Sequence, residues 1–138
     1  MGRRRQARES ALHALYLADL VPALASTAFS LMARLEDADE KTVDFCRGLF
    51  EGTLMLRAEL DERIQETAKN WSISRMAAAD RNILRMAAYE LLYRDDAPPN
   101  VVIDEAIEIA RKYSTEDSTS FINGILDKLK DLPKKKQN

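Results

Sequence analysis

The sequence predicts an all-α protein of about seven helices joined by short connections. Apolar residues recur at three- and four-residue spacing in successive segments, which is the period of an amphipathic helix. No segment shows the alternation that is typical of a β-strand, and there is no internal repeat. With 138 residues, 46% of them apolar and 32% charged, the chain has the length and composition of an ordinary globular domain. We expect one helical domain over residues 1–132 and a disordered basic tail over residues 133–138.

The first half of the chain predicts three helices. The first covers residues 3–20 and ends before Pro22, because a residue that precedes proline avoids helical geometry. A shorter helix is expected over residues 23–35. The acidic run at residues 36–40 is expected to be a solvated corner, and a long helix over residues 41–69 follows it.

The next helix is predicted from Ser74, a suitable N-cap, to about Tyr93. The loop over residues 95–100 contains two prolines and ends it. The segment 101–129, VVIDEAIEIARKYSTEDSTSFINGILDKL, then holds two further amphipathic helices.

A polar corner joins the two helices of that segment. Ser114 and Asp117 stand three residues apart just before an apolar run, which is the arrangement of a helix-capping box. The corner also exposes Thr115 and Glu116 next to Asp117. We therefore interpret it as either an ordinary helix cap or a recognition edge.

Arginines dominate the start of the first predicted helix. Arg4, Arg5 and Arg8 share one broad helical sector with Leu12 and Leu15, so they continue the apolar stripe toward the N-terminus. A guanidinium cannot be buried unpaired, so we expect this part of the helix to overhang the helical bundle. Phosphates match the guanidinium fork, which favours a nucleic acid as the partner. The alternative interpretation is a solvated, partly frayed N-terminus.

The net charge of −2 conceals a polarised distribution. Basic residues near the two ends account for 7 of the 21, which leaves 14 basic residues against 23 acidic residues on the rest of the chain. This asymmetry suits a polyanion at the ends and a basic partner on the body, although solubility alone also explains it.

Composition also indicates the compartment. Cys46 is the sole cysteine, so no internal disulfide is possible and a reducing cytoplasm is expected. No apolar run approaches the roughly 20 residues that a membrane span needs. The basic start is not followed by a long apolar segment, so it does not predict a secretory signal.

Residue patterns that carry catalysis are missing from the sequence. His13 and Cys46 are single, so no His/Cys metal set can be assembled. The four glycines form neither a phosphate-binding loop nor a dinucleotide fingerprint, and no paired nucleophile is present. We expect no metal, no cofactor and no enzymatic activity.

Three segments of the sequence are specific when taken together: RRRQARESALHALY at residues 3–16, ADRNILRMAAYELLY at 79–93 and DEAIEIARKYSTEDSTSFINGILDKL at 104–129. They resemble the NusB family of bacterial antitermination factors. Their order and spacing also match, and only residues 21–70 are nondescript. The last segment is the most specific, since EDS followed by FINGILDK is not generic helix composition.

This resemblance implies two helical subdomains packed roughly at right angles and no catalytic activity. Family members pair with NusE, a small-subunit ribosomal protein, and the pair binds the boxA element of nascent RNA. The complex helps RNA polymerase resist termination, notably on ribosomal RNA operons. The basic N-terminus would then contact RNA, and the acidic body would contact the basic ribosomal protein.

The resemblance also implies roles for individual residues. Arg4, Arg5 and Arg8 match the arginine-rich RNA-binding motif, in which Gln6 departs from the pattern and Arg3 compensates. The resemblance places Tyr16 and Asp80 on the face toward NusE. It places Arg85, Asp117 and Phe121 near the RNA and the edge that is shared with NusE.

Three other positions depart from the family or leave a question open. Thr119 and Ser120 stand where polar or basic residues are frequent, which removes a phosphate contact. Ser114 replaces a frequent glycine, and a left-handed conformation there would cost roughly 1 kcal/mol. Whether Phe121 lies at the surface or in the core is left open by the sequence.

Two alternative functions remain. The same fold forms the N-terminal domain of some ribosomal RNA cytosine methyltransferases, but we do not expect their cofactor-binding domain because this chain ends at Asn138. The other alternative is a structural homodimer that covers its own RNA face. A size measurement with and without RNA distinguishes the homodimer from a NusE heterodimer.

Overall fold

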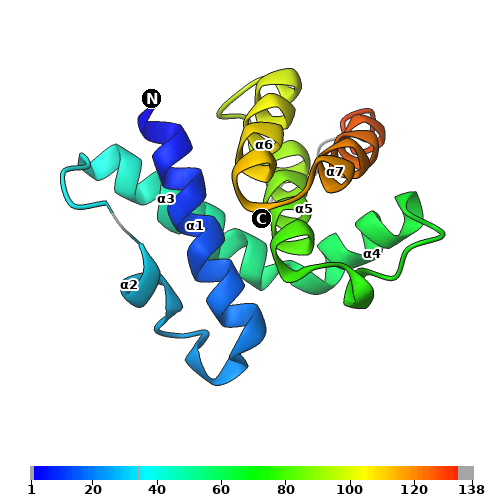
Figure 1. Ribbon diagram of the computed structural model, residues 1–138. Coiled ribbons are helices and arrows are strands. Elements are labelled where there is room, and N and C mark those ends of the chain that lie inside the picture. Colours follow the sequence, from blue (N-terminus) through cyan, green and yellow to red (C-terminus); the bar gives the residue numbers. More distant parts are fainter. Residues whose placement is uncertain (1, 34, 134–138) are drawn as a thin grey trace. The chain divides into compact units, whose positions relative to one another are not determined.

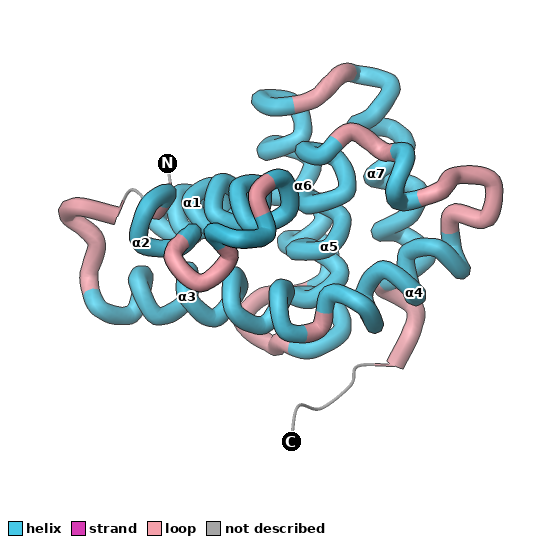
Figure 2. The backbone as a smooth tube through the Cα atoms, turned by 90° about the horizontal axis from the view of Figure 1, so that it is seen from below, coloured by secondary structure: helices cyan, strands magenta, loops and turns pink. Residues whose placement is uncertain are grey.

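The structure, a computed structural model, describes residues 2–33 and 35–133, and these form seven α-helices, two short 3-10 helices and loops (Figures 1 and 2). No strand occurs in these two ranges, which confirms the predicted all-α class. The chain divides into two compact units, Met1–Met55 and Leu56–Asn138. No helix among the described residues has both the length and the apolar character to cross a membrane. The expected tail lies outside the described residues except for exposed Pro133.

The first unit is built on two long helices, α1 and α3, that pack against each other (Figure 1). A short helix, α2, also packs against α1. The buried side of α1 is made mostly of alanines and leucines together with Arg8 and Ser10, and α3 contributes Phe45, Cys46 and Leu49. Burial raises the pKa of the Cys46 thiol to about 12. The elements of this unit are α1 (Arg3–Leu20), η1 (Pro22–Leu24), α2 (Ala28–Met32) and α3 (Glu40–Met55).

The second unit surrounds α5, which packs against α4, α6 and α7. From Asn82 to Leu92 every residue of α5 is buried, as expected of a helix that neighbours cover on all sides. Its partners contribute the apolar faces that their periodicity predicted, such as Ile122, Ile125 and Leu126 on α7. The elements are α4 (Arg57–Thr67), η2 (Ile73–Arg75), α5 (Ala78–Tyr93), α6 (Pro99–Tyr113) and α7 (Glu116–Leu129).

Local sequence explains several helix ends. α1 ends at Leu20, as predicted from Pro22. α3 begins after Asp39, whose carboxylate accepts a hydrogen bond of 2.9 Å from the backbone amide of Thr42. α6 begins with Pro99 at its first position, where the missing amide hydrogen costs nothing.

The helix predicted over residues 23–35 is wrong in its extent. The structure forms η1 there, then a turn, and then the five residues of α2. The Thr27 hydroxyl donates to the Leu24 carbonyl and the Ser30 hydroxyl donates to the Thr27 carbonyl, so side chains compete for backbone groups. Leu24 and Leu31 are exposed, and without burial their periodicity does not stabilise a longer helix.

The single helix predicted over residues 41–69 is also wrong, because Leu56 interrupts it. Its backbone has φ −99° and ψ 16°, outside helical geometry, and α4 begins at the next residue. The physical reason is tertiary. The buried face of α3 packs on α1 in the first unit, whereas Leu60 and Ile64 of α4 are buried in the second unit, where α4 packs on α5 and α7.

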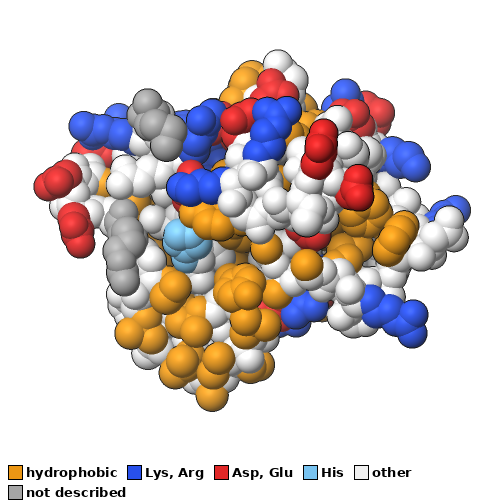
Figure 3. Space-filling view, viewed as in Figure 1, with side chains coloured by type: hydrophobic (Ala, Val, Ile, Leu, Met, Phe, Trp, Pro, Cys, Tyr) orange, Lys and Arg blue, Asp and Glu red, His pale blue; other side chains and the backbone are white. Residues whose placement is uncertain are grey.

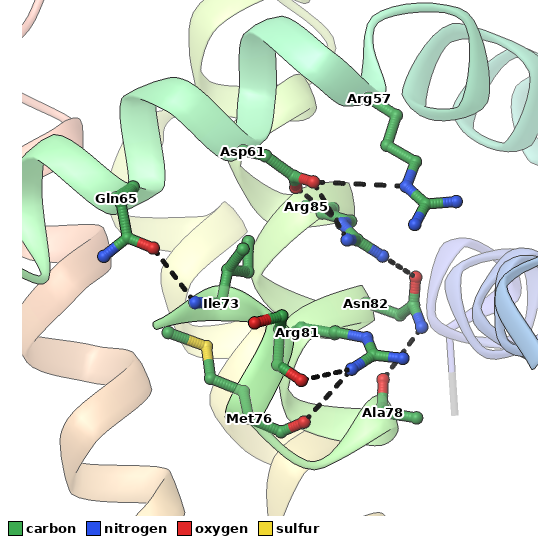
Figure 4. A network of polar contacts seen from close by, with 10 residues as sticks. Arg57, Asp61, Gln65, Ile73, Met76, Ala78, Arg81, Asn82 and Arg85 are labelled. Atoms are coloured by element: carbon green, nitrogen blue, oxygen red, sulfur yellow. Dashed lines mark hydrogen bonds and ion pairs between the residues drawn. The ribbon is translucent and has the colours of Figure 1, made fainter. Parts of the chain in front are cut away.

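Ser74 does not cap the following helix as predicted. It lies within η2, and α5 starts later, after Ala77, which provides no side-chain cap. The Arg81 guanidinium closes this loop, since it donates to the carbonyls of Ser74 at 3.4 Å and Met76 at 3.3 Å (Figure 4). The loop is thus held by a side chain from the helix that follows.

Candidate nucleic-acid and partner interface

The arginines of α1 lie in different environments. Arg3 and Arg4 are exposed, Arg5 is half-buried, and Arg8 is only 3% exposed. The guanidinium carbons of Arg4 and Arg8 lie 4.9 and 5.3 Å from the centre of the Phe45 ring. The predicted overhang is therefore wrong for Arg8, whose guanidinium is accommodated on an aromatic face inside the unit.

The start of α1 favours anions in spite of these contacts. No acidic residue lies in its first turn, and no side chain caps its first amide groups, so the positive end of the helix dipole adds to the arginines. Arg3 pairs with Asp39 at 3.2 Å, but both side chains are more than half exposed. Hydrogen bonds from Thr42 and then the charge of Arg3 lower the pKa of Asp39. Figure 3 shows basic side chains around this end of α1.

The other end of α1 carries an exposed apolar patch. It is formed by Tyr16, Leu20, Val21 and Leu24, each between 37% and 51% exposed. Tyr16 and Leu20 are four residues apart, so they lie on the same face of α1. Apolar side chains gather around this end of the helix in Figure 3. Tyr16, implied by the resemblance to face a partner, is thus available at the surface, and a contiguous apolar patch is typical of an interaction site.

Asp80, which the resemblance places toward NusE, is buried in the second unit. It lies in the first turn of α5, is 7% exposed and accepts a hydrogen bond from the Ser114 hydroxyl. A carboxylate there also interacts favourably with the helix dipole. Asp80 therefore ties the start of α5 to the corner between α6 and α7, and its direct contact with a partner stays a prediction.

Arg85 likewise has a partner inside its own unit. It is 3% exposed, and its Nε and Nη2 donate to the two carboxylate oxygens of Asp61 at 2.6 and 3.0 Å. Its Nη1 donates to the Asn82 side-chain oxygen at 3.2 Å, and Asn82 in turn donates to the Ala78 carbonyl (Figure 4). This bidentate pair joins α5 to α4. The implied contact of Arg85 with RNA stays a prediction, and its structural role is what the geometry establishes.

The corner between α6 and α7 is capped, although not by the predicted pair. Thr115 is the N-cap, and its hydroxyl oxygen accepts from the Ser118 backbone amide at 3.1 Å. Ser114 instead donates to Asp80, and its φ of −137° is extended, so the left-handed conformation considered for it does not occur. Asp117 is exposed in the first turn of α7, free of any capping role. Thr119 and Ser120 line a hollow of about 380 Å³ at this corner, together with Ser114 and Thr115.

Phe121 is half-buried on α7, which answers the question that the sequence left open. Its ring meets the Trp71 ring edge to face, with the centroids 5.4 Å apart and the planes at 62°. Trp71 is 59% exposed. Reasoning from the sequence did not select Trp71 as a site residue, although the signal was present: it is the single tryptophan of the chain and stands at the break between two predicted helices.

The described residues contain no group of three or more His, Cys, Asp or Glu side chains that could hold a metal ion. The candidate interface therefore consists of cationic, aromatic and apolar side chains. Such groups bind anions, nucleic-acid bases and protein surfaces.

Comparisons with known proteins agree with this picture. The model of the NusB family matches residues 5–131. The transcription antitermination protein NusB of Elusimicrobium minutum (strain Pei191) is 48% identical over 140 residues, which cover 100% of both chains. The protein of the same name from Geotalea uraniireducens (strain Rf4) is 47% identical and covers 96% of this chain and 97% of its own.

Solved structures share the fold. T. maritima NusB is 34% identical, with a TM-score of 0.88 over 98% of this chain and 94% of its own. A chain from the crystal structure of antitermination factors NusB and NusE in complex with dsRNA has a TM-score of 0.83 over 93% of this chain and 96% of its own, and its identity of 24% supports the fold alone. The predicted NusB-like fold and the predicted role as a transcription antitermination factor are confirmed, while the right-angle packing of two subdomains stays a prediction. On the family match and these relatives, the chain belongs to the NusB family.

Proposed function

We propose that this antitermination factor binds boxA RNA together with NusE and helps RNA polymerase resist termination, notably on ribosomal RNA operons. It acts in the cytoplasm by binding alone, without a cofactor and without catalysis. The observation that carries the proposal is the start of α1, where exposed and half-exposed arginines coincide with the positive end of a helix that has no acidic residue in its first turn.

RNA contacts are assigned first to Arg3, Arg4 and Arg5, because they reach the surface. Arg8 is buried against Phe45, so its main role is packing inside the first unit and not a direct phosphate contact. Asp117 is exposed on α7, and its charge lowers affinity where phosphate approaches. The expected binding depends strongly on salt, since guanidinium groups that neutralise phosphates release counterions.

NusE is assigned to the apolar patch at the end of α1. Tyr16, Leu20, Val21 and Leu24 would lose their exposed apolar surface to a protein partner, which is favourable by roughly 25 cal/mol per Å². Outside its two basic ends the chain has more acidic than basic residues, and this negative charge attracts a basic ribosomal protein and speeds the encounter. A chain with this fold has been solved with NusE and dsRNA, which supports the proposal at the level of the fold.

A second copy of the chain is the competing occupant of the same patch. Size-exclusion chromatography with light scattering tests this directly. If NusE converts a homodimer into a heterodimer, both partners use the patch. A homodimer that NusE leaves intact would contradict the assignment of NusE to this surface.

The double variant Arg4→Ala/Arg5→Ala is expected to bind single-stranded boxA RNA more weakly and with a flatter salt dependence. The slope of log K against log salt should fall by about 1.4, since each lost phosphate contact on a single strand contributes about 0.7. Fluorescence anisotropy of labelled RNA at several salt concentrations measures both quantities. Arg8 is left unchanged because its burial would mix a folding effect into the result.

The matched control is Lys41→Ala/Arg47→Ala, which removes the same charge from exposed positions of α3 in the same unit. It should change RNA affinity far less. Equal losses in the two double variants would mean that net charge and not the arginine cluster drives binding, and unaltered affinity of the α1 variant would refute the assignment.

A further inference from the structure

Trp71 is held at the surface by an aromatic neighbour. Trp71 is 59% exposed, yet its ring packs edge to face on the ring of Phe121. A large aromatic side chain is normally among the more buried residues of a domain, because it contributes much of the apolar surface removed from water. Packing in the core of the second unit therefore does not explain why the indole of Trp71 lies at the surface.

The backbone around Trp71 is fixed by one side chain, Gln65 of α4. Its amide nitrogen donates to the carbonyls of Ala68 at 3.1 Å and Trp71 at 2.5 Å. Its amide oxygen accepts from the backbone amide of Ile73 at 3.0 Å (Figure 4). Three hydrogen bonds from one amide hold the loop that carries the indole, so the ring is positioned before any ligand arrives.

The aromatic pair borders two hollows of different charge. One, of about 290 Å³, is lined by Lys69 and Lys128 together with Trp71 and Phe121, and no carboxylate lies among its lining residues. Neither lysine forms an ion pair with another residue in the described part of the chain. The other hollow, of about 270 Å³, is lined by two carboxylates, those of Asp80 and Asp117, and by one cation, Arg75. An anion is therefore favoured on the lysine side.

The size of the lysine-side hollow restricts its occupant. Its volume of about 290 Å³ is just below the range for small-ligand pockets, roughly 300–1,000 Å³. That space suits one planar group with an attached anion and is small for a helix or a folded loop. An aromatic platform next to two cations is the arrangement that binds single-stranded nucleic acids, because every base has a π face and every nucleotide carries a phosphate.

We propose that Trp71 is a stacking platform for one unpaired base of the bound RNA, and that Lys69 and Lys128 contact the phosphate of that nucleotide. Phe121 braces the indole from the side, and Gln65 positions the loop. The inference rests on the proposed RNA-binding function and adds to it a nucleotide subsite in the second unit. It also gives Phe121 a positioning role in place of direct stacking.

The single tryptophan makes the proposal directly measurable. Titration of the intact protein with single-stranded boxA RNA should quench its intrinsic fluorescence, with the same dissociation constant that the anisotropy of labelled RNA reports. Trp71→Ala should weaken RNA binding by about five- to 150-fold, the range for loss of one stacked base. Trp71→Phe keeps an aromatic face and should stay within a few-fold of the wild type.

Two matched controls separate stacking from general surface effects. Met55→Ala truncates another exposed apolar side chain and should leave RNA affinity unchanged. Lys128→Ala should weaken binding, whereas Lys130→Ala should not, because Lys130 already pairs with Asp127 at 3.4 Å and does not line the hollow. If Trp71→Ala does not fold, the proposal is still tested on folded proteins, by the fluorescence quenching of the wild type and by the RNA affinities of Lys128→Ala and Lys130→Ala.

The outcomes also separate this proposal from the function on which it rests. Wild-type protein that binds no boxA RNA, alone or with NusE, would contradict the proposed function itself. Binding that depends on Arg4 and Arg5 but leaves Trp71 unquenched, with full affinity in Trp71→Ala and Lys128→Ala, would overturn only the subsite. Loss of NusE affinity with unchanged RNA affinity in Trp71→Ala would identify the platform as a protein contact and also overturn it.

Discussion

Arg85→Ala is expected to destabilise the protein by about 1–3 kcal/mol, because it removes the bidentate partner of the Asp61 carboxylate and leaves it only the 4.0 Å contact with Arg57. Arg85 is 3% exposed and Asp61 is itself mostly covered, with a side-chain exposure of 24%. The substitution also removes the hydrogen bond from Arg85 to Asn82. Urea unfolding followed by circular dichroism measures the loss, which is a large fraction of the roughly 5–15 kcal/mol that stabilises a typical domain.

Arg57→Ala provides the matched control for this prediction. Arg57 approaches the same carboxylate, but its side chain is 42% exposed and its Nε lies 4.0 Å from the Asp61 oxygen. An exposed ion pair contributes at most about 1 kcal/mol, so this variant should unfold close to the wild type. An Arg85→Ala protein with wild-type stability and poor RNA binding would contradict the structural role and support the RNA contact that the family resemblance implies.

Asp80→Lys is expected to cost about 1–4 kcal/mol. The variant loses the hydrogen bond between Ser114 and a buried carboxylate, worth about 1–3 kcal/mol, and places a cation at a helix N-terminus, worth about 0.3–1 kcal/mol. The corner between α6 and α7 should loosen as a result. Urea unfolding and hydrogen exchange at the amides of residues 113–118 measure the two effects.

Asp117→Lys is the corresponding control, since Asp117 is exposed in the first turn of α7. The same charge reversal should cost only about 0.3–1 kcal/mol there. A third variant, Asp80→Asn, keeps an acceptor for Ser114 and removes the charge. If it retains stability but loses NusE affinity, Asp80 contacts the partner directly. If it retains both, Asp80 acts by positioning the corner.

Sequence periodicity located most of the helices because burial of an apolar stripe is a local property of the chain. The C-terminal end of α1 followed from Pro22, and the apolar faces of α6 and α7 followed from their spacing. Periodicity failed where the neighbouring element decides the outcome. Leu56 breaks a continuous helical pattern because the residues before and after it pack in different units.

The sequence by itself determined the kind of chemistry at the interface, namely arginines for an anion and an acidic body for a basic partner. Only the tertiary structure decided which of those groups are available to a partner. The sequence indicates that Arg8, Asp80 and Arg85 contact a partner, yet each is buried against Phe45, Ser114 or Asp61. Trp71 shows the reverse: a side chain of a type that is usually well covered lies at the surface, beside Phe121 and on a loop that Gln65 holds. The physical reason is that the free energy of a charge or a ring depends on what surrounds it, and contacts between residues distant in sequence supply those surroundings.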